Sequence, residues 1–141
     1  MKIAIRYQSR GGNTKTMAET AAEALGVSAL PIDEGLTERT DRLILCGGTY
    51  AFTADEAMLR FISDLDPELI GEAVVMVTAS GTKHGLKAIT GALIKKGITV
   101  SDKSYLLKLK GQGLALLGRA GGELTEEQKK EITAFAREMG K

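Results

Sequence analysis

The feature that most constrains this chain is a polar, glycine-containing loop between a strand and a helix near the N-terminus. Apolar residues 2–7 predict a buried strand, and a helical pattern begins at about Asn13. The first N–H groups of a helix lack intrahelical acceptors, and the helix dipole is positive at that end. Such a junction suits a phosphate group. The alternative is a tight turn in which Asn13 merely caps the helix.

The rest of the chain alternates between short apolar runs and amphipathic segments. Further strands are expected at residues 27–32, 43–46 and 73–78, and a last strand at 98–100 and 105–109, broken at 101–103. Pro31 places the second strand at a sheet edge, because proline cannot donate to a ladder. We expect the third strand to end at Gly47 and Gly48, and residues 35–42 to form a loop.

Four helices are expected between these strands. The first runs from Asn13 to Gly26, a natural C-terminal cap. Thr53 and Glu56 have the spacing of a capping box, and so do Thr125 and Gln128. These pairs predict helices that end before Pro67 and close to the C-terminus, respectively. A further helix follows the loop at residues 79–85, with Leu86, Ile89 and Leu93 on one face and Gly97 at its end.

Five strand signals alternating with four helices predict an α/β fold. We expect one domain over residues 1–141, built as a three-layer αβα sandwich around a five-stranded parallel sheet. The loops after strands one, three and four would then meet at the carboxyl edge, where open α/β sheets bind ligands.

Composition excludes several classes of protein. The 141 residues are 43% hydrophobic and 26% charged, with a net charge of +1, and no apolar run is long enough to span a membrane. The near-neutral charge and 4% aromatic content argue against a nucleic-acid partner. One cysteine and an N-terminus that enters a strand directly, without a leader pattern, favour a cytoplasmic protein.

Several phosphate and nucleophile motifs are also excluded. No Gly-Lys-Ser/Thr follows the first loop, and Gly11-Gly12 lacks the third glycine of the dinucleotide fingerprint. Cys46 stands where a phosphorelay receiver has aspartate, and no arginine closes a phosphatase loop at residues 47–52. Cys46 is therefore expected to be a buried, inert thiol. We expect no catalytic side chain and no metal site.

The first loop resembles the signature of the flavodoxin family. Matching positions run from the end of the strand into the helix: Tyr7, Ser9, Gly12, Asn13, Thr14 and Ala18. Two positions depart from the pattern, since Arg6 and Ala21 stand where apolar or branched aliphatic residues are usual. The resemblance covers essentially the whole chain through the order and length of its elements, and it implies the flavodoxin-like strand order 2-1-3-4-5.

The resemblance implies that the cofactor is FMN and that three loops hold it. The phosphate would lie in the first loop, at Ser9, Arg10, Gly11, Gly12, Asn13 and Thr14, with Arg10 adding charge. The loop after strand three would flank the flavin ring with Thr49, Tyr50, Ala51 and Phe52. The loop after strand four would line the pyrimidine edge with Ser80, Gly81, Thr82, His84 and Gly85.

Some of these residues have ordinary structural alternatives. Tyr50 is favoured as the stacking residue, whereas Phe52 suits either the flavin or the core. His84, the only histidine, is more often a solvated or hydrogen-bonded loop residue than a catalytic group. Lys83 and His84 stand where the family commonly has an acidic residue. A cation near the ring would stabilise reduced flavin, so we expect a less negative potential than acidic flavodoxins have.

These features lead to three functional hypotheses. The first is an FMN-binding electron carrier between a reductase and an acceptor, with redox proteins or small electron acceptors as partners. The second is a small FMN-dependent NAD(P)H:quinone-type reductase, and the third is a flavodoxin-like module without tight flavin binding. The sequence leaves open whether the chain is a monomer or a homodimer. It also leaves open whether the glycine-rich residues 111–122 cover the flavin, form a dimer contact or are a surface loop.

Overall fold

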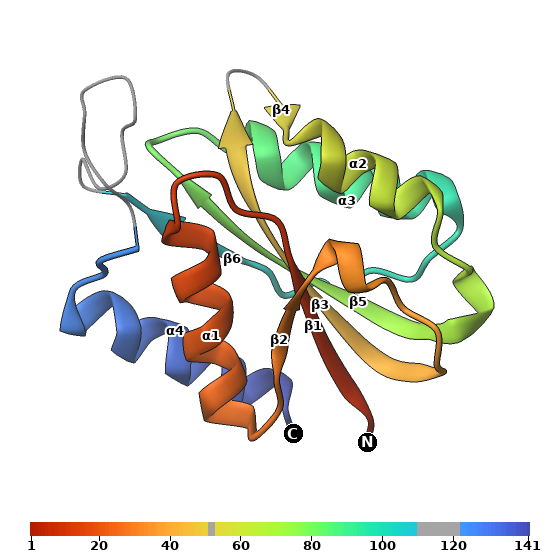
Figure 1. The fold of residues 1–141 in the computed structure, drawn as a ribbon, viewed down its shortest axis with the longest axis horizontal. Helices are drawn as coiled ribbons and strands as arrows, with labels where there is room; N and C mark the ends of the chain where they lie inside the picture. The colour runs from red at the N-terminus through yellow and green to blue at the C-terminus, as the bar shows by residue number, and fades with distance from the viewer. Residues whose placement is uncertain (51–52, 110–121) are drawn as a thin grey trace.

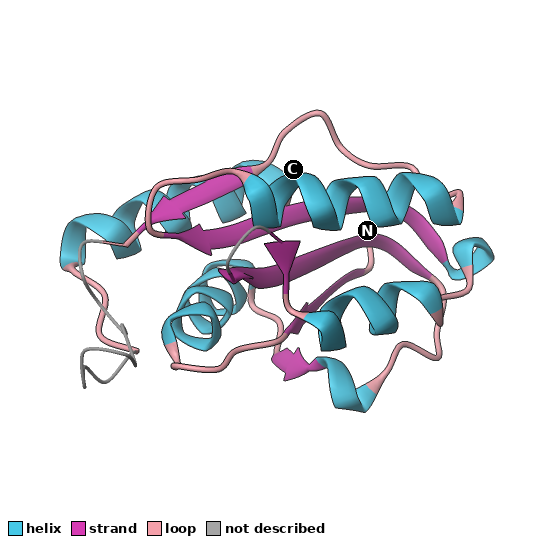
Figure 2. Cartoon of the chain, turned by 90° about the horizontal axis from the view of Figure 1, so that it is seen from above, coloured by secondary structure: helices cyan, strands magenta, loops and turns pink. Residues whose placement is uncertain are grey.

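The computed structural model describes residues 1–50, 53–109 and 122–141, which form helical layers on both faces of a sheet (Figures 1 and 2). The sheet has the strand order β2-β1-β3-β5-β6. These five strands are parallel. Their bounds are Ala29–Pro31 (β2), Ile3–Tyr7 (β1), Thr40–Tyr50 (β3), Ile70–Ala79 (β5) and Tyr105–Lys108 (β6). A two-residue β4, Thr53–Ala54, pairs antiparallel with the end of β3. The predicted order 2-1-3-4-5 is confirmed for the parallel strands.

Helices cover both faces of this sheet. Helices α1 (Asn13–Leu25) and α4 (Glu126–Met139) lie on one face, and α2 (Glu56–Ser63) and α3 (His84–Lys96) lie on the other (Figure 1). Short 3-10 turns, Ile32–Glu34 and Pro67–Leu69, lead out of β2 and into β5. Side chains alternate along a strand. In β3, Ile44 and Cys46 therefore join the core under α1 and α4, while Leu43 and Leu45 join the core under α2 and α3.

Several predicted boundaries are confirmed. Gly26 caps α1 with a φ of 69°, and Thr125 and Gln128 form a complete capping box at the start of α4. Strand β2, with Pro31, lies at a sheet edge. The interrupted last strand is also found, because Val100 bridges to Ala73 before β6 pairs with the end of β5.

The third strand is longer than predicted and runs through Gly47 and Gly48 to Tyr50. Both glycines allow side chains to pack closely against the strand, on opposite faces of the sheet. A Cβ on Gly47 would come within 2.8 Å of the Ile89 side chain, and one on Gly48 within 2.9 Å of the Tyr50 hydroxyl. The glycines therefore permit close contacts and do not end the strand.

The predicted capping box of Thr53 and Glu56 is wrong. Thr53 pairs with Tyr50 in the β3–β4 ladder, and the N-cap of α2 is Asp55, whose carboxylate accepts from the Ala57 N–H. Helix α3, on the same face of the sheet as α2, also starts earlier than expected. His84 and Gly85 belong to the first turn of α3 rather than to the preceding loop.

Arg6, one of the two departures from the flavodoxin signature, has a structural role in β1. Its Nε donates to the Gly35 carbonyl at 2.7 Å, and its Nη1 donates to the Ile5 carbonyl at 3.0 Å. The side chain therefore ties the first strand to the connection that follows β2. In the part of the chain that the structure describes, none of the helices is long and apolar enough to cross a lipid bilayer.

Candidate functional site

The ends of β1, β3 and β5 bring the three predicted loops to one edge of the sheet (Figure 1). Strands β1 and β3 are neighbours there, and the chain reaches β2 on one side of β1 and β3 on the other. This is the point at which the strand order reverses. Crevices at such switch points are the usual ligand sites of open α/β sheets.

The first loop turns sharply at Gly12, the residue that precedes α1. Gly12 has a φ of 101°, a conformation that L side chains rarely adopt, and its N–H donates to the Ser9 hydroxyl at 3.1 Å. The N-cap residue, Gly12, has no side chain with which to cap this helix end, and the first turn of α1 holds no acidic residue. The positive end of α1 therefore faces the loop without a carboxylate of its own first turn to neutralise it.

Two of the predicted loop residues, Asn13 and Thr14, direct their side chains into the protein. The Asn13 side-chain oxygen accepts from the Gly122 N–H at 2.7 Å, and the Thr14 hydroxyl lies 2.9 Å from that of Thr78 at the end of β5. Both residues are buried. The Thr16 hydroxyl also donates to the Gly122 carbonyl at 2.8 Å. These hydrogen bonds hold the loop and the start of α1 against later parts of the chain.

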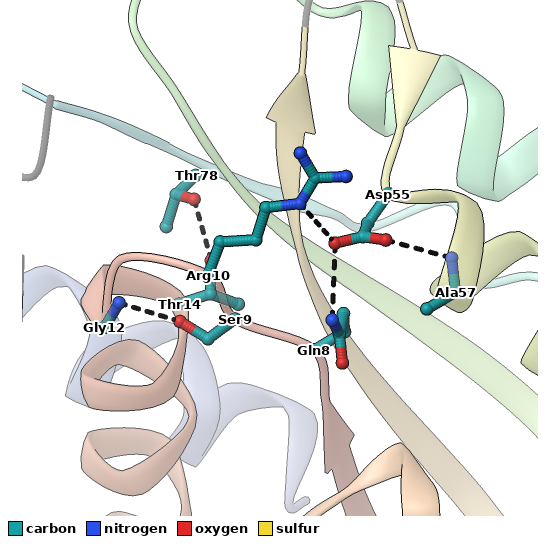
Figure 3. A network of polar contacts seen from close by, with 8 residues as sticks. All are labelled: Gln8, Ser9, Arg10, Gly12, Thr14, Asp55, Ala57 and Thr78. Atoms are coloured by element: carbon teal, nitrogen blue, oxygen red, sulfur yellow. Dashed lines mark hydrogen bonds and ion pairs between the residues drawn. The ribbon is translucent and has the colours of Figure 1, made fainter. Parts of the chain in front are cut away.

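Arg10 reaches across from the first loop to the segment after β3 (Figure 3). Its Nε lies 2.9 Å from Oδ2 of Asp55, which also accepts from Gln8 Nε2 at 3.3 Å. The other Asp55 oxygen caps α2 at the Ala57 N–H, 2.9 Å away. Burial would raise the pKa of Asp55, but the hydrogen bonds from Arg10, Ala57 and Gln8 outweigh it and lower the pKa. Asp55 is therefore a buried carboxylate that links two of the predicted loops.

Tyr50 lies beneath Arg10 as the last residue of β3, and not in a loop as predicted. The Arg10 guanidinium carbon is 4.0 Å from the centroid of its ring. The ring also folds back along the strand against Gly48, which has no Cβ to obstruct it. Burial raises the pKa of the Tyr50 phenol, and a backbone hydrogen bond from Arg10 offsets part of this effect. Tyr50 is thus held against the strand with the guanidinium on its ring.

Thr49 points to the opposite face of the sheet, beneath the start of α3. Its hydroxyl is buried and has no hydrogen-bond partner among the described residues. A Cβ on Gly85 would lie 2.4 Å from this oxygen and 2.9 Å from the Gly48 carbonyl. Gly85 therefore allows α3 to approach the end of β3 closely.

The remaining predicted residues are mostly on the surface. Ser80, Gly81, Thr82 and His84 are exposed, as is Lys83, whereas Gly85 is buried. Ala51 and Phe52 lie outside the described residues. The three segments therefore share one edge, and side-chain contacts of Arg10 join the first two.

Cys46 is buried in β3, as predicted, and is not disulfide-bonded. Burial raises the pKa of its thiol to about 12, so the thiolate that a nucleophile requires is absent at neutral pH. Among residues 1–50, 53–109 and 122–141, no group of histidine, cysteine and carboxylate side chains is arranged to hold a metal ion.

A large hollow lies well away from this edge. It has a volume of about 810 Å³, and its lining includes Arg42, Glu72, Lys103 and Glu138. These charges are already paired, Arg42 with Glu72 at 3.1 Å and Lys103 with Glu138. We therefore base the candidate site on the carboxyl edge and not on this hollow.

Comparison with known proteins supports the same fold. Three solved structures illustrate the likeness. A flavodoxin from the domain Archaea has a TM-score of 0.73 at 15% identity, over 99% of this chain and 96% of that one. The chain has a flavodoxin-like fold. Oxidised flavodoxin 2 from Bacillus cereus has a TM-score of 0.68 at 19% identity, over 96% of this chain and 95% of that one.

An NADH:FMN oxidoreductase in its apo form is also similar, with a TM-score of 0.65 at 13% identity over 99% of this chain and 89% of that one. No protein-family model matches the sequence, and no curated protein matches it. At these identities the likeness of the flavodoxin-like chain to solved structures concerns its fold alone.

The sequence did not reveal four residues that organise this edge of the flavodoxin-like sheet: Gln8, Asp55, Thr78 and Gly122. Asp55 could have been found from the sequence, since an aspartate directly before a helix is a good N-cap. Thr53 was chosen as the N-cap because it has capping-box spacing, but it pairs in β4. Thr78 and Gly122 contact α1 only through the tertiary fold, from 64 and 109 residues away in the chain.

Proposed function

We propose that this chain binds FMN at the carboxyl edge of its sheet and carries electrons between a reductase and an acceptor. The observation that carries the proposal is the start of α1, whose N-cap is a left-handed Gly12 without a side chain, at the switch point of a flavodoxin-like sheet. When bound, the flavin supplies one- or two-electron transfer, while the protein supplies binding, orientation and electrostatics.

The residues present fit a phosphate-bearing ligand. Helix α1 begins in this loop, where its first backbone N–H groups have no intrahelical acceptor, and no carboxylate in its first turn opposes an anion. Two other N–H groups of the loop are already used, because Arg10 donates to the Tyr50 phenol and Gly12 donates to the Ser9 hydroxyl. Ser9 uses its oxygen to accept from Gly12, so its hydroxyl proton is still available to a phosphate oxygen. We assign the phosphate to this loop.

The end of β3 and the start of α3 are assigned to the ring. The buried hydroxyl of Thr49 has no hydrogen-bond partner among the described residues, and Tyr50 has an aromatic face. Across the edge, the exposed residues Ser80, Gly81, Thr82 and His84 would line the polar rim of the flavin. Ala51 and Phe52, between β3 and β4, stay predicted contacts.

The test is a fluorescence titration of the purified protein with FMN and, separately, with riboflavin. Bound flavin is expected to lose fluorescence, and FMN is expected to bind more tightly because riboflavin lacks the phosphate. Absence of quenching with both flavins would contradict the proposal. Equal affinity for the two flavins would contradict the assignment of the first loop to the phosphate.

A reductase of quinone-type acceptors is the second candidate. Exposed Arg10 and Lys83 lie at the same edge and suit a phosphate-bearing nicotinamide donor. Oxidation of NADH or NADPH by the FMN-loaded protein, measured with and without a quinone, distinguishes the two roles. A carrier oxidises neither nucleotide unless a separate reductase is added.

A further inference from the structure

The outer side of the Tyr50 ring is covered by Arg10, and this contact bears on the proposed function. The guanidinium carbon lies 4.0 Å from the ring centroid, and the ring folds against Gly48. A flavin that stacked on the side of Tyr50 facing Arg10 would need the same space as the guanidinium. Arg10 therefore competes with a planar ligand for this face.

Arg10 is paired with a buried carboxylate, that of Asp55, and is itself exposed. The Asp55 side chain is 6% exposed and is held by Ala57 and Gln8, while the Arg10 side chain is 57% exposed. Asp55 also caps α2, so moving it would disturb a helix. Moving the Arg10 side chain breaks its ion pair with Asp55 (Figure 3). The only other side-chain contact of Arg10 that the structure records among the described residues is the one with the Tyr50 ring.

We propose that Arg10 and Asp55 form a latch that closes the outer face of Tyr50 and sets the affinity of this edge for planar rings. In the latched state, Asp55 holds the guanidinium on Tyr50 through Nε. A ring that binds there displaces the guanidinium and takes over its stacking contact. This proposal rests on the proposed function, because it assumes that the ring site includes Tyr50.

The latch and a direct phosphate contact predict opposite effects of removing Arg10 on flavin affinity. If Arg10 mainly attracted the phosphate, its removal would weaken FMN binding and leave riboflavin unaffected. If Arg10 mainly covers Tyr50, its removal should strengthen binding of riboflavin, which has no phosphate. An exposed cation–π contact corresponds to roughly a twofold to fivefold change in affinity, and we expect the riboflavin Kd of Arg10→Ala to fall by about that factor.

Two further variants separate the latch from charge and from folding. Lys15→Ala also removes one positive charge, on an exposed side chain in the first turn of α1, and should leave the riboflavin Kd unchanged. Asp55→Asn keeps a good helix cap but loses the ion pair with Arg10. It should strengthen riboflavin binding, though less than Arg10→Ala does, because the guanidinium can still rest on Tyr50.

Salt provides a second measurement, in which the riboflavin affinity of each protein is first compared with its own value at low salt. Salt screens an ion pair that has an exposed member, as Arg10 is in its pair with Asp55, so added NaCl should weaken the latch. Riboflavin is uncharged, and its affinity for the wild-type protein should therefore rise with salt relative to its affinity for Arg10→Ala. A parallel salt dependence in the two proteins would overturn the proposal.

The possible results distinguish failure of the latch from failure of the proposed function. Wild-type protein that binds FMN, with an Arg10→Ala variant that binds riboflavin no more tightly, would overturn the latch and leave the flavin site standing. Wild-type protein that binds flavin weakly, with an Arg10→Ala variant that binds it well, would support both. Absence of flavin binding in every variant would overturn both.

Discussion

The buried carboxylate of Asp55 provides the sharpest test of how this edge is held together. It accepts hydrogen bonds from the Ala57 N–H, from Arg10 and from Gln8. Two substitutions separate the helix cap from the charge. Asp55→Ala removes every one of these bonds, whereas Asp55→Asn retains a side-chain oxygen that can cap α2.

The expected magnitudes follow from the contacts. Loss of an N-cap costs about 0.5 to 2 kcal/mol, and Asp55→Ala also leaves the side-chain amide of the partly buried Gln8 without this acceptor. We expect Asp55→Ala to lower the free energy of unfolding by about 2 kcal/mol. Asp55→Asn should lose less than half as much at neutral pH, because the remaining loss comes from an ion pair whose arginine is exposed.

Urea denaturation at a series of pH values is the assay. The pKa of Asp55 is lower in the folded protein than in the unfolded chain, where it is about 3.9. Its charge therefore contributes stability that is fully present above the unfolded value and is lost as the pH falls through the lower, folded value. The stability difference between wild type and Asp55→Asn should shrink over that acid range.

Two results would refute this reasoning. Equal destabilisation by Asp55→Ala and Asp55→Asn at neutral pH would mean that the cap contributes little. A difference between wild type and Asp55→Asn that persists unchanged into acid would mean that the charge of Asp55 is not stabilised by the fold. Both variants should have the urea m-value of the wild type, since the surface exposed on unfolding does not change.

Three other predictions concern single positions at the candidate site. Gly12→Ala should cost about 1 to 3 kcal/mol of stability and weaken FMN binding, because the φ of 101° disfavours a side chain. Gly91→Ala, in α3, is the control for both titrations, because Gly91 has no positive φ and has open space for a Cβ. Thr49→Val should leave the free energy of unfolding unchanged or raise it by up to about 1 kcal/mol, because the lost hydroxyl has no partner among the described residues; marked destabilisation in urea would contradict this. In a redox titration, the FMN-loaded protein should have a less negative potential than acidic flavodoxins, and Lys83→Glu should make it more negative; a low-potential hydroquinone couple in the wild type would sink this idea.

Local sequence patterns predicted most of the fold. The alternation of apolar strands with amphipathic helices led to the parallel sheet, and the capping box of Thr125 and Gln128 marked the start of α4 correctly. Pro31 identified an edge strand because it lacks an N–H. These signals are reliable because each depends on residues that are close together in the chain.

The contacts within the candidate site needed the tertiary structure. Arg10 was predicted to serve the phosphate, but its partner in the structure is Asp55, 45 residues further along the chain. Asn13 and Thr14 likewise find their side-chain partners at Gly122 and Thr78. The sequence therefore located the loop between β1 and α1 that we propose as the phosphate site. Only the packing of distant strand ends decided what its side chains contact, because those partners become neighbours only when β1, β3 and β5 align in the sheet.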